Sequence, residues 1–180
     1  MRAARRGLSA ARRRPLRLWE LLAALVTGAV EFFVIGAVAV GVYGFERATK
    51  DLDIVPAPDS ENLARLYTVL VELEAEPIEL TDFRSEELPY LFSLEGLTHG
   101  GNWFLTTRCG RVDVMQYIDG VLESAEDYAG LAARTLPLET PVGTVRFVAY
   151  DDLLQMKYAA GRDLDLTDIR ALREARGELA

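Results

Sequence analysis

The chain has very few of the residues that build disulfide frameworks, zinc sites and histidine-dependent catalytic centres. Among its 180 residues there is one cysteine, Cys109, and one histidine, His99. A single cysteine excludes an internal disulfide and a cysteine-rich zinc site, and it fits a reducing compartment such as the cytoplasm. A Ser-His-Asp triad or a histidine-based metal site would have to depend on His99 alone. These classes of site are therefore poor candidates, and we expect a cytoplasmic protein.

Long uncharged apolar runs are also lacking. Glu20 precedes the apolar residues 21–30, and Glu31 separates them from the apolar residues 32–45. The longest uncharged run is therefore shorter than the ~20 residues that a membrane-spanning helix needs. Although a basic start followed by apolar residues imitates a signal sequence, we expect neither export nor contact with a membrane.

Acidic residues are absent from the first 17 positions, which contain seven arginines. The whole chain has 20 basic and 28 acidic residues, so residues 18–180 carry 13 and 28, a net charge of −15. This imbalance predicts a flexible arginine-rich tail over residues 1–15, which is either a nucleic-acid-binding arm or the product of an upstream start codon. The remainder, 16–180, is long enough for a single domain with a core. Its acidity argues against broad, non-specific binding of nucleic acid by the domain itself.

Strand and helix patterns alternate along this domain, which predicts an α/β (α+β) fold with a small mixed sheet and helices packed on it. We expect a helix over 16–27, a helix beginning at 37, a helix capped by Asp59 or Ser60, a helix capped by Asp151 or Asp152 that Gly161 ends, and a last helix over 166–176. Strands are expected over 30–35, around 51–55, over 103–109 and 111–118 as a hairpin turning at Gly110, and over 144–149. Residues 78–103 are expected to contain a loop that covers the functional site of the domain.

The pair Asp51 and Asp53 is the most informative feature that is present. Both lie within the apolar frame of Leu52, Ile54 and Val55, which predicts a short buried strand. Because strand side chains alternate between faces, the two carboxylates point the same way. Two carboxylates on one face repel each other and are costly to desolvate, and a bound divalent cation resolves both problems. Hard oxygen ligands suit Mg²⁺.

A predicted strand, a turn at Gly36 and a helix starting near Ala37 lie immediately upstream. The start of a helix presents free backbone N–H groups and the positive end of the helix dipole, so this turn suits an anion. An anion site next to a metal-binding carboxylate pair indicates a nucleoside triphosphate with Mg²⁺.

The stretch from 36 to 53 resembles the nucleotidyltransferase superfamily of the DNA polymerase β type, and within it the small bacterial nucleotidyltransferase-like proteins related to abortive-infection toxins. The family pattern runs from a glycine turn through a helix to Gly-x-x-Arg-x-Thr-x-Asp-x-Asp. The matching positions are Gly36, Gly44, Arg47, Thr49, Asp51 and Asp53. Ala37 departs from the pattern, because many active members carry Ser or Gly there. A second match near the C-terminus comprises Lys157, Arg162, Asp165 and Asp168.

The resemblance implies a nucleotidyltransferase fold and an enzyme that moves a nucleoside monophosphate from an NTP, ATP among the candidates, to an acceptor hydroxyl. Asp51 and Asp53 would hold two Mg²⁺ ions, and Asp113, on a later strand, would be the third metal ligand and would help to take the proton of the hydroxyl. Backbone amides of Gly36 and Ala37 would bind the terminal phosphates. Arg47, Lys50 and Lys157 are the candidate cations beside them, and Arg47 and Arg162 can also be structural ion-pair residues.

Three possibilities remain for the acceptor and the role. The acceptor is a tRNA or a protein, possibly within a toxin–antitoxin system that supplies an antitoxin-like partner protein. Alternatively it is a small molecule such as an aminoglycoside. The third possibility is a non-catalytic module that binds a nucleotide or a partner; the three acids argue against it, and Ala37 argues for it. An acidic groove would favour a cationic small molecule, and a basic groove leading to Asp113 would favour tRNA.

Overall fold

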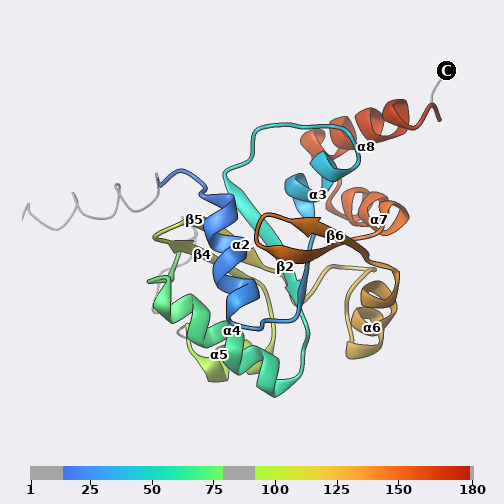
Figure 1. The fold of residues 1–180 in the computed structure, drawn as a ribbon. Coiled ribbons are helices and arrows are strands. Elements are labelled where there is room, and N and C mark those ends of the chain that lie inside the picture. Colours follow the sequence, from blue (N-terminus) through green and yellow to red (C-terminus); the bar gives the residue numbers. More distant parts are fainter. Residues whose placement is uncertain (1–13, 79–91, 179–180) are drawn as a thin grey trace, which may run out of the picture.

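The computed structural model describes residues 14–78 and 92–178, so the predicted tail lies outside the described residues except for positions 14 and 15. The structure is a mixed sheet with helices on both faces (Figure 1). Its elements are α2 (Leu18–Thr27), β1 (Phe32–Val34), α3 (Gly36–Val42), β2 (Asp51–Pro56), α4 (Ser60–Glu72), β3 (Glu76–Pro77), α5 (Leu94–His99), β4 (Trp103–Thr107), β5 (Gly110–Val114), α6 (Ala125–Arg134), β6 (Leu136–Thr140), β7 (Gly143–Phe147), α7 (Tyr150–Ala160) and α8 (Asp163–Ala175).

The sheet has seven strands in the order β3-β4-β5-β2-β1-β7-β6. The pairs β2–β5 and β1–β7 are parallel, and the other neighbours are antiparallel. The prediction of a mixed α/β sheet is therefore confirmed. β2 lies at the centre of the sheet, so the carboxylates that it carries are held by strands on both sides.

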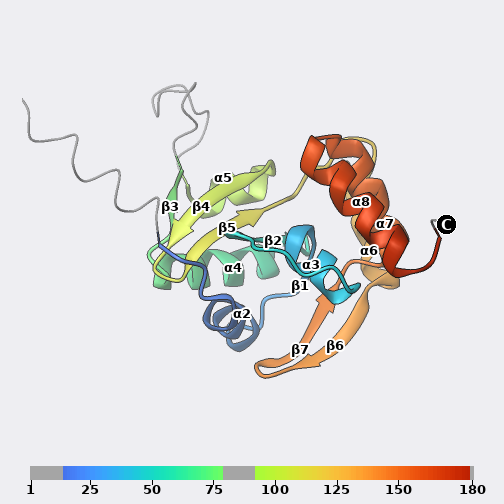
Figure 2. The same ribbon diagram turned by 90° about the horizontal axis from the view of Figure 1, so that it is seen from above.

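Helices α2 and α4 cover one face of the sheet, and α3, α7 and α8 lie on the other (Figure 2). α4 packs on β2 and on α2, whereas α3 contacts both β2 and α7. Strand alternation on β2 explains this division: Leu52 and Ile54 are fully buried on one side, and Asp51 and Asp53 are only partly buried on the other. The core therefore forms mainly under α2 and α4, and the acidic face of β2 is left to the α3 and α7 side.

Several predicted boundaries shift in the structure. α4 begins as predicted, with Asp59 as its N-cap accepting a hydrogen bond from the Asn62 backbone at 2.9 Å. The predicted caps of α7 are wrong, because the helix begins at Tyr150 with Ala149 at the N-cap and no side-chain hydrogen bond there. α8 begins at Asp163 rather than at residue 166. Gly161 ends α7 as predicted, in the left-handed conformation with φ +61°.

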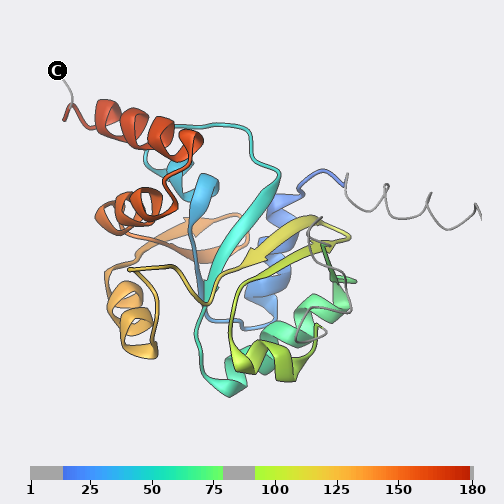
Figure 3. The ribbon, with the colours of Figure 1, turned by 180° about the vertical axis from the view of Figure 1, so that it is seen from behind.

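The predicted loop over the site is only partly described. Residues 79–91 lie outside the described residues, and the described part contains α5, which packs against α4. From behind, α5 lies beside α4 and away from α7 and α8 (Figure 3). Residues 92–102 do not line the cavity around the acidic pair, so the prediction is wrong for this described part.

None of the helices within 14–78 and 92–178 has both the length and the apolar character needed to cross a bilayer.

Candidate active site

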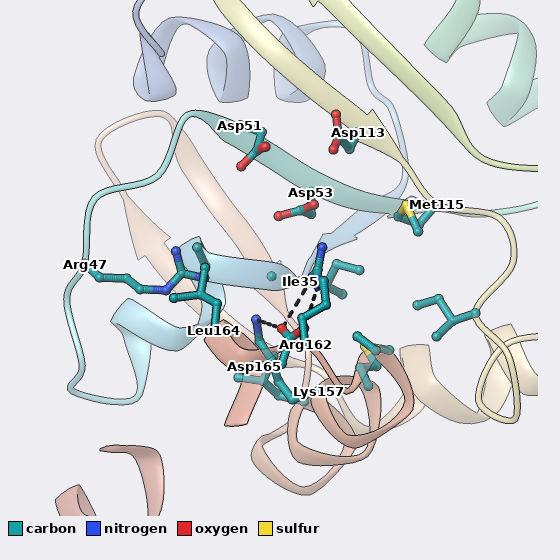
Figure 4. Close-up of a pocket in the computed structure, with 16 residues that line it drawn as sticks. Ile35, Arg47, Asp51, Asp53, Asp113, Met115, Lys157, Arg162, Leu164 and Asp165 are labelled. Carbon is teal, nitrogen blue, oxygen red and sulfur yellow. Dashed lines mark hydrogen bonds and ion pairs between the residues drawn. The ribbon is translucent and has the colours of Figure 1, made fainter. Parts of the chain in front are cut away.

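Three carboxylates and an arginine are brought together by the register of β2 and β5. In this parallel pair Asp53 lies opposite Asp113, and Asp51 lies opposite Arg111. Residues two apart on a strand share a face, so all four side chains lie on the α3 and α7 side of the sheet. Figure 4 shows the three carboxylates along one wall of a cavity. The structure thus places Asp113 beside the Asp51–Asp53 pair, on the neighbouring strand that the family resemblance implied.

Burial and mutual repulsion raise the proton affinity of two of these acids. The pKa of Asp53 rises from 3.8 to about 7, mainly because the group is desolvated and further because Asp51 and Asp113 are negatively charged. Burial also raises the pKa of Asp113 to about 6, although the neighbouring Arg111 opposes the shift. The Oδ1 atom of Asp113 is buried and accepts no hydrogen bond from the described residues. The site therefore holds negative charge that the protein itself does not fully satisfy.

Arg111 is a site residue that the sequence analysis did not identify. Its Nη2 lies 3.9 Å from Asp51 Oδ2 and 3.6 Å from Asp113 Oδ1. It therefore supplies part of the positive charge that keeps three acids together on one face. Strand alternation could have identified it, because Arg111 precedes Asp113 by two residues on an otherwise apolar strand and therefore lies on the same face.

Gly36 adapts the backbone to the carboxylate of Asp53. It has φ +66°, and a Cβ at this position would lie 1.9 Å from Asp53 Oδ2. Glycine is thus required both by the backbone conformation and by the close approach. Gly36 is the first residue of α3, and both Gly36 and Ala37 line the cavity as the sequence predicted.

Three basic residues face the acids from the opposite wall, which is formed by the loop before β2 and by the junction of α7 and α8 (Figure 4). Lys157 is buried, and its Nζ lies 2.9 Å from Asp165 Oδ1 and 2.8 Å from Asp168 Oδ2. Arg47 donates to both carboxylate oxygens of Asp168, at 2.8 and 3.0 Å. Arg162 donates to Asp165 at 2.7 Å. These pairings fix α8 to α7 and to the loop.

The predicted phosphate-binding cations therefore differ in their availability. Arg47 and Lys157 line the cavity, but both are engaged by carboxylates of α8. Lys50 is exposed and does not line the cavity. Arg162, which the sequence left as a structural ion-pair residue, lines the cavity as well as pairing with Asp165.

The cavity between the two walls has a volume of about 310 Å³. Charged side chains line both walls, and the apolar side chain of Met115 follows Asp113 along the acid wall (Figure 4). Ile118 also lines the cavity. The remaining apolar lining comes from Ile35, Leu153, Met156, Ala160 and Leu164. The pocket thus combines charged and apolar side chains, and two of the apolar ones, Met115 and Ile118, follow Asp113 in the sequence.

The carboxylate oxygens of Asp51, Asp53 and Asp113 are chemically suited to bind a hard divalent cation. Carboxylate oxygens are the ligands that Mg²⁺ prefers, and Asp113 Oδ1 is a buried oxygen to which no described residue donates a hydrogen bond. Within the described residues no three Asp, Glu, His or Cys side chains already form a closed metal-binding group. Asp51, Asp53 and Asp113 would therefore need further ligands, such as water or phosphate oxygens, to complete a site, which is usual for Mg²⁺.

Comparison with known proteins identifies the fold. No protein-family model matches the sequence, and no curated protein matches it in sequence either. Solved structures do match, among them the lincosamide antibiotic adenylyltransferase LnuA bound to lincomycin, with a TM-score of 0.57 and 14% identity over 90% of this chain and 99% of that one. The antibiotic-resistance factor ANT(2'')-Ia matches with a TM-score of 0.52 and 14% identity, over 90% of this chain and 83% of the other.

A third similar structure is a candidate nucleotidyltransferase from Thermotoga maritima, with a TM-score of 0.51 and 16% identity over 90% of this chain and 91% of that one. None of these three is described as a toxin, so the narrower resemblance to abortive-infection toxins stays a prediction. The seven-stranded mixed sheet and its covering helices have the nucleotidyltransferase fold.

Proposed function

We propose that the protein is a Mg²⁺-dependent nucleotidyltransferase that moves a nucleoside monophosphate from an NTP to an acceptor hydroxyl and releases pyrophosphate. The observation that carries this proposal is the in-register placement of Asp53 and Asp113 on adjacent parallel strands, with Asp51 two residues away on the same face. A purely structural role would not explain three acids on one cavity wall, two of them with a raised pKa.

The positions of the three acids suggest different roles, metal binding for two of them and proton acceptance for the third. Asp51 and Asp53 would hold two Mg²⁺ ions, which when bound would neutralise phosphate charge and activate the acceptor oxygen. Asp113 lines the cavity two residues before Met115, and its carboxylate would accept the proton of the attacking hydroxyl. The backbone amides of Gly36 and Ala37 would contact the phosphates, with support from the positive charge of Arg47 and Lys157, which line the cavity.

A small-molecule acceptor is favoured by the surroundings of Asp113. Met115 and Ile118, which follow Asp113 along the chain, add apolar side chains to the cavity lining, and the chain from Val114 to Glu123 contains no lysine or arginine. A polyanionic tRNA would be better served by basic residues on this path. Two of the similar structures are an antibiotic adenylyltransferase and an antibiotic-resistance factor, which supports the same choice. A protein or tRNA acceptor, with an antitoxin-like partner, is the second candidate and is supported by the family resemblance.

The test is a transfer assay with each of the four NTPs labelled at the α-phosphate, Mg²⁺, and a bacterial extract divided by ultrafiltration into small molecules and macromolecules. We expect label to move into one compound of the small-molecule fraction, with release of unlabelled pyrophosphate. Asp53→Asn should abolish the transfer, and Asp119→Asn, at an exposed acid outside the cavity, should not. Label in the macromolecular fraction would identify the second candidate. Binding of NTP without transfer to either fraction would favour the non-catalytic alternative.

A further inference from the structure

The charges at the junction of α7 and α8 do not balance. Two carboxylates, Asp165 and Asp168, are shared by three cations, Arg47, Lys157 and Arg162. Both carboxylates are almost completely buried, with exposures of 1% and 0%. One positive charge therefore remains in excess on the cavity wall that faces the acids of β2 and β5.

Two of the three cations are fully engaged. Lys157 is 5% exposed, and its ammonium lies between the two carboxylates. Arg47 uses Nε and Nη2 on Asp168 and turns Nη1 to the backbone oxygen of Ala48 at 3.4 Å. A ligand could recruit either cation only by leaving a buried carboxylate less well paired, which is costly.

Arg162 differs from both in its accessibility. Its side chain is 76% exposed, although it lines the cavity. It donates to Asp165 through Nε at 2.7 Å and through Nη2 at 3.4 Å, and among the described residues Nη1 donates no hydrogen bond. In Figure 4 its guanidinium lies between Asp165 and the wall that carries Asp53. One edge of the guanidinium is thus held in place, and the other edge faces the cavity.

We propose that Arg162 is the residue that binds the triphosphate of the incoming nucleotide, and that Asp165 and Lys157 position it. This inference rests on the proposed function. A triphosphate entering the cavity is repelled by the acids of one wall and needs a cation on the other. A guanidinium held by a carboxylate along its Nε edge is pre-organised to donate to phosphate oxygens through its remaining N–H groups. Lys157 and Arg47 together neutralise Asp165 and Asp168, which leaves the charge of Arg162 available to a ligand.

The experiment measures binding of two probes by calorimetry in the presence of Mg²⁺. The probes are inorganic tripolyphosphate, which has no base, and the non-hydrolysable α,β-methylene analogues of the four NTPs. The variants are Arg162→Gln, which removes the charge, and Arg162→Lys, which keeps it but lacks the planar fork. The matched control is Arg170→Gln, an exposed arginine within α8, the helix that Arg162 precedes, and it does not line the cavity.

We expect Arg162→Gln to weaken binding of both probes by about tenfold or more, because a hydrogen bond to a charged group contributes about 1.5–3 kcal/mol. Arg162→Lys should lose part of this affinity, and Arg170→Gln should lose almost none. Binding by the unmodified protein together with equal affinity in Arg162→Gln and Arg170→Gln would overturn the assignment of Arg162 alone. If the unmodified protein binds neither probe, the proposed function is wrong and this inference is wrong with it.

Discussion

Asp53 is the residue at which the demands of folding and of chemistry conflict most directly. Its carboxylate lies beside Asp113 across the β2–β5 pair and against the backbone of Gly36. The pKa of Asp53 is about 7 in the folded protein and 3.8 in the unfolded chain. Between these two values the folded protein therefore binds a proton on Asp53 that the unfolded chain has released. Between about pH 4 and pH 7 the contribution of Asp53 to the free energy of unfolding therefore falls as the pH rises. Above pH 7 this contribution is fully lost.

The first prediction follows for Asp53→Asn. The amide keeps the shape and removes the charge, so the variant should be more stable than the unmodified protein at pH 8, on the order of 1–4 kcal/mol without metal, and the difference should shrink toward pH 4. Nucleotide transfer should be lost at every pH. Thermal melts across this range check the prediction, with Asp119→Asn as the control. A variant that is unfolded at pH 8 would mean that Asp53 is a structural hydrogen-bond acceptor.

The second prediction concerns the glycine that faces this carboxylate. Gly36→Ala would place a methyl group 1.9 Å from Asp53 Oδ2, at a φ that alanine disfavours. We expect a loss of about 1–3 kcal/mol in stability and no detectable binding of Mg²⁺ with tripolyphosphate, because the carboxylate must move.

Gly120→Ala separates the effect of the positive φ from the effect of the close approach to Asp53. Gly120 has the same φ of +66°, but a Cβ there would meet nothing within 4 Å. This variant should show only the backbone cost and should keep full binding. Equal behaviour of the two variants in the binding measurement would show that the close approach to Asp53 is unimportant.

At the scale of elements, the buried lysine joins α7 to α8. Lys157→Met should destabilise the protein by about 3–5 kcal/mol, because Asp165 and Asp168 would lose a shared partner inside the protein. The chain has one other lysine, Lys50, which is exposed, so Lys50→Met is the matched control and should change stability very little. Chemical denaturation of both variants gives the comparison. A small effect at Lys157 would mean that the arginines replace it in the network.

The elements that could be predicted are those with a buried face or a distinct terminal signal. α4 has an apolar stripe and an aspartate cap, and β2 and β5 have buried residues on both sides of their acids. By contrast, α6 and β6 were not predicted. α6 buries only Leu131, and β6 is an edge strand without a buried residue, so neither has the periodic pattern on which prediction depends.

The residues of the site also differ in how far the sequence could predict their neighbours. The shared face of Asp51 and Asp53 follows from strand alternation, and their proximity to Asp113 came from the family resemblance. The partners of Lys157 could not be predicted, because its ion pairs depend on how α8 folds back on α7. Arg111 was missed for a related reason. A charged residue on a strand looks solvent-exposed until the neighbouring strand is known.

At the scale of the whole molecule, the question is how much of the chain the domain needs. Leu16 and Arg17 already contact the turn between β4 and β5, where the Arg17 backbone N–H donates to the Cys109 carbonyl oxygen at 2.8 Å. A chain shortened to begin at Leu16 keeps this contact and every residue of the proposed site. We therefore predict that it folds with an unchanged melting temperature and an unchanged affinity for Mg²⁺ with an NTP analogue.

The same shortened chain also distinguishes the acceptors. If the acceptor is tRNA, loss of the arginines should weaken acceptor binding and reduce its salt dependence, because fewer counterions are released. If it is a small molecule, neither should change. Filter binding of bulk tRNA at several salt concentrations provides the measurement, and loss of NTP binding would show that the domain begins before Leu16.

Both outer strands of the sheet contain a proline, Pro77 on β3 and Pro137 on β6. A proline has no N–H to offer to an incoming strand, and β3 spans only two residues. Each edge is therefore a poor template for a strand of another molecule. Edge-to-edge growth of the sheet into fibrils is therefore disfavoured even at high protein concentration.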